Sequence, residues 1–221
     1  MAVVAIVAGL SIPSGAATTP YAQMKHVIAD ITKENSARVI ATLTMAGKRL
    51  VNTTDATNIG GHQKIVLTVK GKSNTVNIEL VNNGGLYVKG DEAILIAYMG
   101  FPTSTAKQLS NQWFSIPKSN ADYAEVAQGL TLGSIASELT MNKNVTMSVR
   151  TGLSGFEALR GTSVKSALEP SSAETLDFMP TGSPLPAQAF QTYQGSTSVI
   201  VFSHWNENVT LTVPKAKFQL K

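Results

Sequence analysis

Apolar and polar residues alternate through three short segments near the middle of the chain, between Gln63 and Gly90. Alternation with a period of two places every second side chain on one face of a strand, so each segment predicts a strand with one apolar face. Residues 71–74 and 82–85 are rich in Gly and Asn, which tolerate the positive φ of tight turns. We therefore expect an antiparallel meander, whose apolar positions are Ile65, Leu67, Val69, Val76, Ile78, Leu80, Leu86 and Val88.

The chain before the meander predicts one helix and one clear strand. Thr19 and Pro20 suit a helix start, because Thr caps a helix N-terminus and Pro fits the first turn. We expect this helix to lie across the sheet, opposite the meander, since its apolar residues recur at helical spacing. Those residues are Met24, Val27, Ile28 and Ile31. Val39–Met45 alternates as a strand, and the polar Gly47–His62 predicts a hairpin or a weak edge strand.

The chain after the meander predicts helices and then a return to strands. The apolar run Asp91–Met99 indicates a buried helix that Gly100 and Pro102 end. Residues 120–139 have a helical pattern that Gly129 and Gly133 break or kink. Shorter elements are a helix at Ala106–Asn111 and strands at Trp113–Pro117, Val145–Val149, Phe156–Ala158, Leu176–Phe178, Val199–Val201 and Val209–Val213. About eight to ten strands and three helices without βαβ alternation predict an α+β fold on an antiparallel sheet.

Composition narrows the class of protein. The chain has 221 residues, enough for one sizeable domain, and its 43% hydrophobic content with 14% charge excludes a disordered chain. The net charge of +4 is scattered, so we expect no nucleic-acid binding, whereas weak attraction to an anionic envelope surface fits it. The absence of cysteine excludes disulfides, thiol nucleophiles, zinc–thiolate sites and lipidation at a cysteine.

The apolar run Ala2–Ile12, followed by small residues, is typical of the later part of a secretory signal. We expect residues 1–19 to be a signal segment. We also expect this segment to be truncated, because the positively charged leader of a signal is missing: no Lys or Arg precedes Lys25. A buried N-terminal strand or helix is the alternative. Residues 20–214 are then one domain, and residues 215–221 a tail.

Candidate catalytic and metal-binding patterns are weak. The three histidines, His26, His62 and His204, are far apart in the sequence and lack metal-ligand spacing. Residues 152–155 (Gly-Leu-Ser-Gly) lack the spacing of a nucleophile elbow and predict a hairpin turn instead. Gly60-Gly61 and Gly84-Gly85 lack the pattern of a phosphate loop and read as turn glycines. We therefore expect no catalytic residue, no cofactor and no metal.

Several motifs in order carry a family resemblance. They are the leading helix, the meander ending in residues 85–91 (GLYVKGD), the following apolar helix, and the motifs at 112–117 (QWFSIP), 182–186 (GSPLP) and 202–207 (FSHWNE). Over about residues 20–214, the chain resembles the actinobacterial cell-envelope lipoproteins of the LppX/LprG type, which are related in fold to the periplasmic lipoprotein carrier LolA. Such lipoproteins carry a lipid-modified cysteine after the signal, whereas Ala16 and Ala17 stand near that place here.

The resemblance implies a half-barrel, in which a curved antiparallel sheet holds helices on its concave side. It also implies a hydrophobic cavity for the acyl chains of a lipid or lipoglycan. An envelope transporter or a membrane surface would be the partner of such a monomeric exported protein. The chain would then lie in the cell envelope or periplasm, or be secreted.

Two hypotheses follow for the apolar positions of the sheet and helices. In the first, they line a lipid cavity with a gate at Ile94–Pro102, and the polar head stays at the rim. In the second, they fill a core, and the protein is a structural or interaction module of the cell surface. The candidate cavity residues are Val27, Ile31, Leu67, Ile78, Leu80, Val88, Ile94, Tyr98, Met99, Leu130, Ile135 and Leu139.

Overall fold

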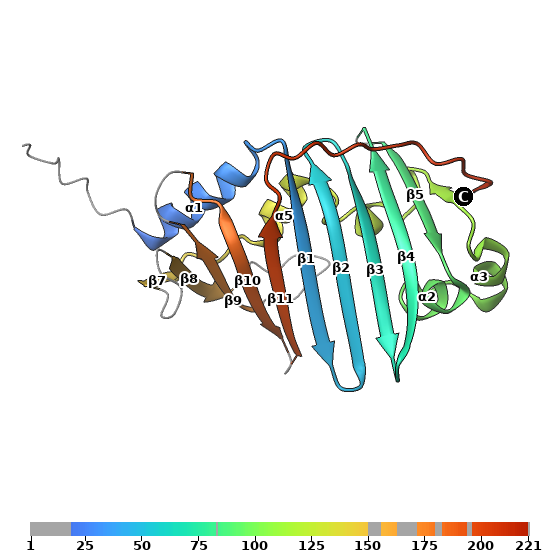
Figure 1. The fold of residues 1–221 in the computed structure, drawn as a ribbon, viewed down its shortest axis with the longest axis horizontal. Helices are drawn as coiled ribbons and strands as arrows, with labels where there is room; N and C mark the ends of the chain where they lie inside the picture. The colour runs from blue at the N-terminus through green and yellow to red at the C-terminus, as the bar shows by residue number, and fades with distance from the viewer. Residues whose placement is uncertain are drawn as a thin grey trace, which may run out of the picture.

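One large sheet organises the molecule (Figure 1). The computed structural model describes residues 19–82, 84–149, 156–162, 172–179, 183–193 and 196–220, which form twelve strands and five helices. The strand order is β12-β6-β5-β4-β3-β2-β1-β11-β10-β9-β8-β7. Neighbouring strands are antiparallel except β12 and β6, which are parallel. The predicted turn at 152–155 and residues 1–18 of the predicted signal segment lie outside the described residues.

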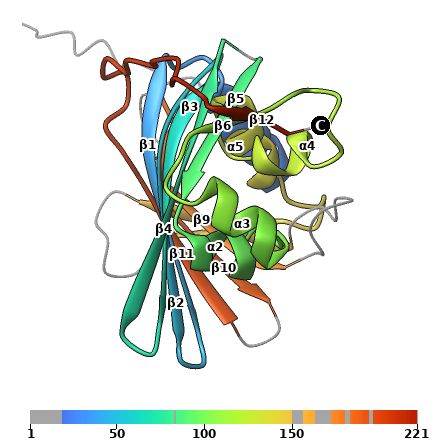
Figure 2. The same ribbon diagram turned by 90° about the vertical axis from the view of Figure 1, so that its right-hand side faces the viewer.

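The strands are β1 (Ser36–Met45), β2 (Lys48–Thr57), β3 (Gly61–Val69), β4 (Lys72–Val81), β5 (Gly85–Gly90), β6 (Phe114–Ile116), β7 (Thr146–Val149), β8 (Glu157–Thr162), β9 (Ala173–Phe178), β10 (Pro186–Tyr193), β11 (Ser196–Ser203) and β12 (Phe218–Gln219). The helices are α1 (Pro20–Ile31), α2 (Glu92–Ala97), α3 (Thr103–Leu109), α4 (Tyr123–Val126) and α5 (Leu132–Glu138). Figure 2 shows α2, α3, α4 and α5 on the same side of the curved sheet. The predicted α+β half-barrel is therefore confirmed. Within the described residues, no helix combines the length and the apolar character needed to cross a membrane.

The meander is confirmed as β3, β4 and β5, and its predicted apolar face is buried except at Val69, which is half-buried. The helix start predicted at Thr19 and Pro20 forms as expected, and the structure adds a second capped start at Asp91. The Thr19 hydroxyl accepts a hydrogen bond from the Ala22 N–H at 3.2 Å, and the Asp91 carboxylate accepts one from the Ile94 N–H at 3.0 Å. These caps satisfy N–H groups that a helix leaves unpaired at its start.

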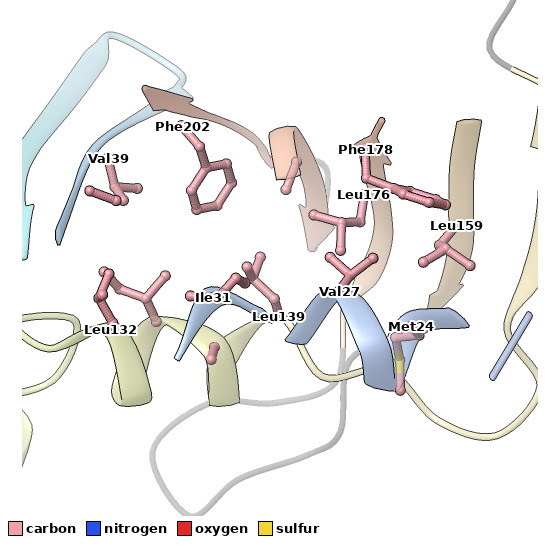
Figure 3. Close-up of a cluster of buried hydrophobic side chains, with 14 of the residues drawn as sticks. Met24, Val27, Ile31, Val39, Leu132, Leu139, Leu159, Leu176, Phe178 and Phe202 are labelled. Carbon is pink, nitrogen blue, oxygen red and sulfur yellow. The ribbon is translucent and has the colours of Figure 1, made fainter. Parts of the chain in front are cut away.

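Two separate hydrophobic clusters pack between the sheet and the helices. In the first core cluster, α1 and α5 cover β1 and β7–β11, and Figure 3 shows Phe202 and Leu176 of the sheet facing helix residues such as Ile31. In the second core cluster, α2 and α3 cover the meander and β6. The expectation that α1 lies opposite the meander was therefore wrong. Because β11 pairs with β1, the last strands extend the sheet beneath α1.

Three local predictions also need correction. Gly47–His62 contains β2, a ten-residue central strand that pairs along its length with β1 and β3. Val209–Val213 forms no strand, and β12 forms beyond it, within the predicted tail. Gly133 lies inside α5 and breaks nothing, whereas Gly129, at φ +73°, separates α4 from α5.

The C-terminal segment, residues 204–217, runs along one end of the strands and reaches β6 (Figure 1). At its start, the Asn206 N–H donates to the Ser36 carbonyl at 2.9 Å, and the Ser36 hydroxyl donates to the Glu207 carbonyl at 2.5 Å. At its end, the Lys217 N–H donates to the Trp113 carbonyl at 2.9 Å. The segment thereby places β12 and its neighbours at the far edge of the sheet.

Gly61 marks a close approach between the sheet and the link from α4 to α5. A Cβ atom at this position would lie 2.3 Å from the Leu130 carbonyl oxygen, closer than real Cβ contacts. An isolated bridge between Thr57 and Thr131 ties the same link to the end of β2. Gly61 is therefore needed for close packing, a role that its reading as a turn glycine missed.

Candidate functional site

A cleft opens on the concave face of the sheet, between the two core clusters. Strands β2, β3, β4 and β6 form one side of it, and the end of α2, α4 and the α4–α5 link form the other. Figure 2 shows these helices over the sheet. The cleft has a volume of about 580 Å³, within the range of pockets that hold small organic ligands.

Part of the lining of the cleft is apolar. Alternation along β3 and β4 brings Ile65 and Ile78 onto the concave face, where both are almost fully buried. On the other side, Gly100 has φ +72° and reverses the chain after α2, so that Phe101 returns and packs edge-on against Phe114 at 5.8 Å between ring centroids. The apolar lining residues are Ile65, Ile78, Tyr98, Met99, Phe101, Ile116, Val126 and Leu220.

A short chain of polar side chains crosses the sheet side of the cleft. The Gln63 amide nitrogen donates to the Thr54 hydroxyl at 3.1 Å, and that hydroxyl donates to the Asn52 side-chain oxygen at 3.1 Å. Gln63 is 4% exposed and Thr54 is 3% exposed. We name these three residues, Asn52, Thr54 and Gln63, the polar floor.

Carboxylates form the charged part of the lining. Asp122 and Glu125 come from the start and middle of the α4 region, and Glu138 is the last residue of α5. The described residues that line the cleft include no Lys, Arg or His. The lining of the cleft is therefore mixed: each side has apolar side chains, the sheet side also has the polar floor, and the helix side also has the three carboxyl groups of α4 and α5.

A smaller cleft of about 70 Å³ lies beside the first and reaches toward the first core cluster. The two clefts share Asn52, Gln63, Gly129 and Glu138, so they meet at the polar floor. The rest of the smaller cleft is lined by the polar residues Thr54 and Gln191 and by apolar side chains, which are Val39, Ala41, Ile135, Leu139, Ile200 and Phe202. The concave face thus offers a larger cleft of mixed lining and a smaller, mostly apolar cleft, with the polar floor between them.

The residues that the sequence predicted for a cavity fall into three groups. Ile78, Tyr98 and Met99 line the larger cleft, and Ile135 and Leu139 line the smaller one. The others lie in the two core clusters and line neither cleft: Val27, Ile31, Leu67, Leu80, Val88, Ile94 and Leu130. Contact with a ligand stays a prediction for all twelve.

Sequence reasoning missed both polar and apolar lining residues. Gln63 stands two residues before Ile65, so the same alternation that predicted the strand places Gln63 on the concave face. The position of Gln63 on this face could therefore have been predicted from the sequence. Leu220 had no comparable signal, because it reaches the cleft only through the pairing of β12 with β6.

A second group of polar residues lies along four neighbouring strands, away from the cleft. The Arg38 guanidinium donates two hydrogen bonds to the Asp55 carboxylate, at 2.6 and 2.9 Å. Farther along the row, burial raises the pKa of Glu79 above the usual value for glutamate, and the charge of His62 partly offsets this. Among the described residues, no group of three His, Cys, Asp or Glu side chains is placed to hold a metal ion.

Comparison with known proteins bears on the fold. No protein-family model and no curated protein matches the sequence. Among solved structures, LprF from Mycobacterium bovis matches with a TM-score of 0.56 and 14% identity, over 87% of this chain and 95% of that one. The Mycobacterium tuberculosis lipoprotein LppX matches with a TM-score of 0.51 and 15% identity, over 87% of this chain and 98% of that one. The chain therefore has the fold of the LppX/LprG-type proteins, and the resemblance read from its motifs is confirmed at the level of structure.

Proposed function

We propose that this protein is an exported, non-enzymatic binding protein that carries an amphiphilic lipid with an acyl chain in the larger cleft. The observation that carries the proposal is the 580 Å³ cleft, open between the concave sheet and the helices and walled by Ile65, Ile78 and Phe101. The fold shared with the lipoprotein LppX supports the same function. The proposed ligand class is a lipid or lipoglycan, and the proposed site of action is the cell envelope.

Burial of hydrocarbon supplies the binding energy in this proposal. Each methylene moved from water into the cleft contributes about 0.8 kcal/mol, so ten methylenes contribute about 8 kcal/mol. Association and ordering cost roughly 4–15 kcal/mol, so ten methylenes leave at most about 4 kcal/mol of net binding free energy, which is a weak affinity. A carrier needs such an affinity, because it must release its lipid to a membrane or to a transporter.

The end of α2 is the proposed gate. Ile96 and Tyr98 are large hydrophobic residues that are 37% and 47% exposed, and Tyr98 lines the cleft together with Met99. The chain reverses at Gly100, so a change of backbone angles there would swing Tyr98 and Phe101 relative to the sheet. We propose that lipid enters and leaves past this segment, with the protein acting as a monomer.

Two measurements test the function. Protein purified from its native host is extracted with organic solvent and the extract is analysed by mass spectrometry, and binding of a fluorescent fatty acid is then titrated. We expect a co-purifying amphiphile and saturable binding. If neither is found, the carrier proposal fails and the surface-module hypothesis with a filled core replaces it.

A pair of tryptophan variants locates the binding site. Met99→Trp places a bulky ring in the cleft wall and should weaken probe binding about tenfold, the equivalent of about two methylenes left unburied. Val201→Trp is the matched control, because Val201 is a strand residue that is 41% exposed and lines neither cleft. Equal binding by both variants would place the probe elsewhere.

A further inference from the structure

The geometry points to a polar subsite inside the cleft: we propose that Asn52, Thr54 and Gln63 bind a neutral hydroxyl or amide group of the lipid. This inference rests on the proposed function and deepens it. It differs from the expectation that the whole polar head stays at the rim. It also names the chemistry that distinguishes one amphiphile from another.

The hydrogen bonds of the polar floor leave unused the Gln63 side-chain oxygen, the Asn52 amide nitrogen and the second hydrogen of the Gln63 amide nitrogen. Thr54 accepts from Gln63 and donates to Asn52, which uses the Gln63 amide nitrogen and the Asn52 carbonyl oxygen. The Gln63 Oε1 and Asn52 Nδ2 atoms then make no hydrogen bond to any described residue. An amide nitrogen carries two donor hydrogens, so Asn52 offers both of them.

Burial makes these unused groups informative. Gln63 is only 4% exposed, and it lines both clefts at the point where they meet. Gly129 faces it, since a Cβ at this position would lie 3.8 Å from the Gln63 nitrogen, and position 129 carries no side chain that could cover the amide. Neither unused atom is among the fully enclosed side-chain atoms without a partner, so the small surface that each one exposes opens into the clefts, where water or a ligand can pair with it. A hydroxyl or amide both donates and accepts, and it matches an acceptor at Gln63 and a donor at Asn52.

The charge of the lining decides against an anionic group at the same place. Glu138 approaches the floor from α5, and Asp122 and Glu125 border the larger cleft. The described lining residues supply no cation to offset a carboxylate or phosphate drawn in beside them. The subsite therefore favours a neutral hydrogen-bonding group over an anion on the same acyl chain.

Competition between matched ligands tests the subsite. N-palmitoylethanolamine and palmitate share one acyl chain, and each is titrated at pH 7.5 against a bound fluorescent fatty acid. We expect the wild type to prefer the amide by about tenfold, the equivalent of one to two net hydrogen bonds. Gln63→Met keeps the side-chain length and should reduce the preference for the amide over palmitate from about tenfold to between about onefold and threefold. Gln108→Met, on the exposed face of α3, should keep it.

The outcomes separate this proposal from the proposed function. If the wild type binds neither compound, the carrier function itself fails. If it binds both equally, or if Gln63→Met keeps the wild-type ratio, the subsite is refuted while the carrier function stands. Asn52→Leu tests the donor end of the floor independently, and it replaces Gln63→Met should that variant not fold.

Discussion

Replacement of Asp91 by alanine should destabilise the protein because one carboxylate holds α2 at two points. Its Oδ1 atom accepts the cap hydrogen bond from the Ile94 N–H at 3.0 Å, and its Oδ2 atom accepts from the Thr75 N–H of β4 at 2.6 Å. Loss of a cap costs about 1 kcal/mol, and loss of a hydrogen bond to a charged group costs about 1.5–3 kcal/mol. We therefore expect Asp91→Ala to lower the free energy of unfolding by about 2–4 kcal/mol.

Urea titration followed by far-ultraviolet circular dichroism measures this change, with the slope m expected to stay at the wild-type value. Asp91→Asn is the informative control, because asparagine caps helices well but its amide nitrogen cannot accept from Thr75. Its loss of stability should fall between zero and that of Asp91→Ala. A loss below about 0.5 kcal/mol for Asp91→Ala, or equal losses for both variants, would refute the two-point attachment.

Three further predictions concern close packing, pH and charge. Gly61→Ala should lower the free energy of unfolding by more than about 2 kcal/mol, because its Cβ would meet a backbone carbonyl at 2.3 Å. Gly133→Ala lies in open space on α5 and should raise the free energy of unfolding by about 0.5 kcal/mol. Thermal unfolding of both variants checks this prediction, and equal effects would contradict it. The raised pKa of Glu79 means that the folded state binds the Glu79 proton more tightly than the unfolded state does. The contribution of Glu79 to the free energy of unfolding therefore falls as the pH rises above 4.5. Glu79→Gln should flatten this pH dependence of stability, and a pH profile equal to that of the wild type would contradict the prediction. A double-mutant cycle of Arg38 and Asp55 should give a coupling of about 0.5–1 kcal/mol that weakens in high salt, and zero coupling would show that the paired hydrogen bonds add nothing.

The sequence was most informative where structure depends on neighbours in the chain. Period-two alternation predicted β3, β4 and β5, the cap residue Thr19 predicted the start of α1, and an apolar run predicted α2. It underrated β2, because polar residues such as Asn52 and Thr54 occupy the concave face of that strand. A polar residue on the inner face of a central strand breaks the usual pattern, and such exceptions are expected at functional sites.

The sequence pattern did not predict which strands that are distant in the chain pair with each other. The antiparallel pairing from Arg38–Ser203 to Thr44–Thr197 joins β1 to β11, and it extends the sheet beneath α1, which therefore covers the last strands rather than the meander. The cleft likewise combines Ile78, Phe101 and Leu220, which alternation cannot bring together. Periodicity identified which side chains face the concave side of the sheet. The structure shows which of these side chains pack in the two core clusters and which line the cleft.

A spin-labelled fatty acid tests the central claim most directly, because it reports where an acyl chain lies. Doxyl-stearate is added to protein with labelled methyl groups, and broadening of each methyl resonance is measured by NMR. An acyl chain in the cleft predicts strong broadening at Ile78 and Ile116 and little at Leu176, which lies in the first core cluster. Broadening confined to the exposed Val201, or no selective broadening at all, would contradict a lipid-binding cleft on the concave face.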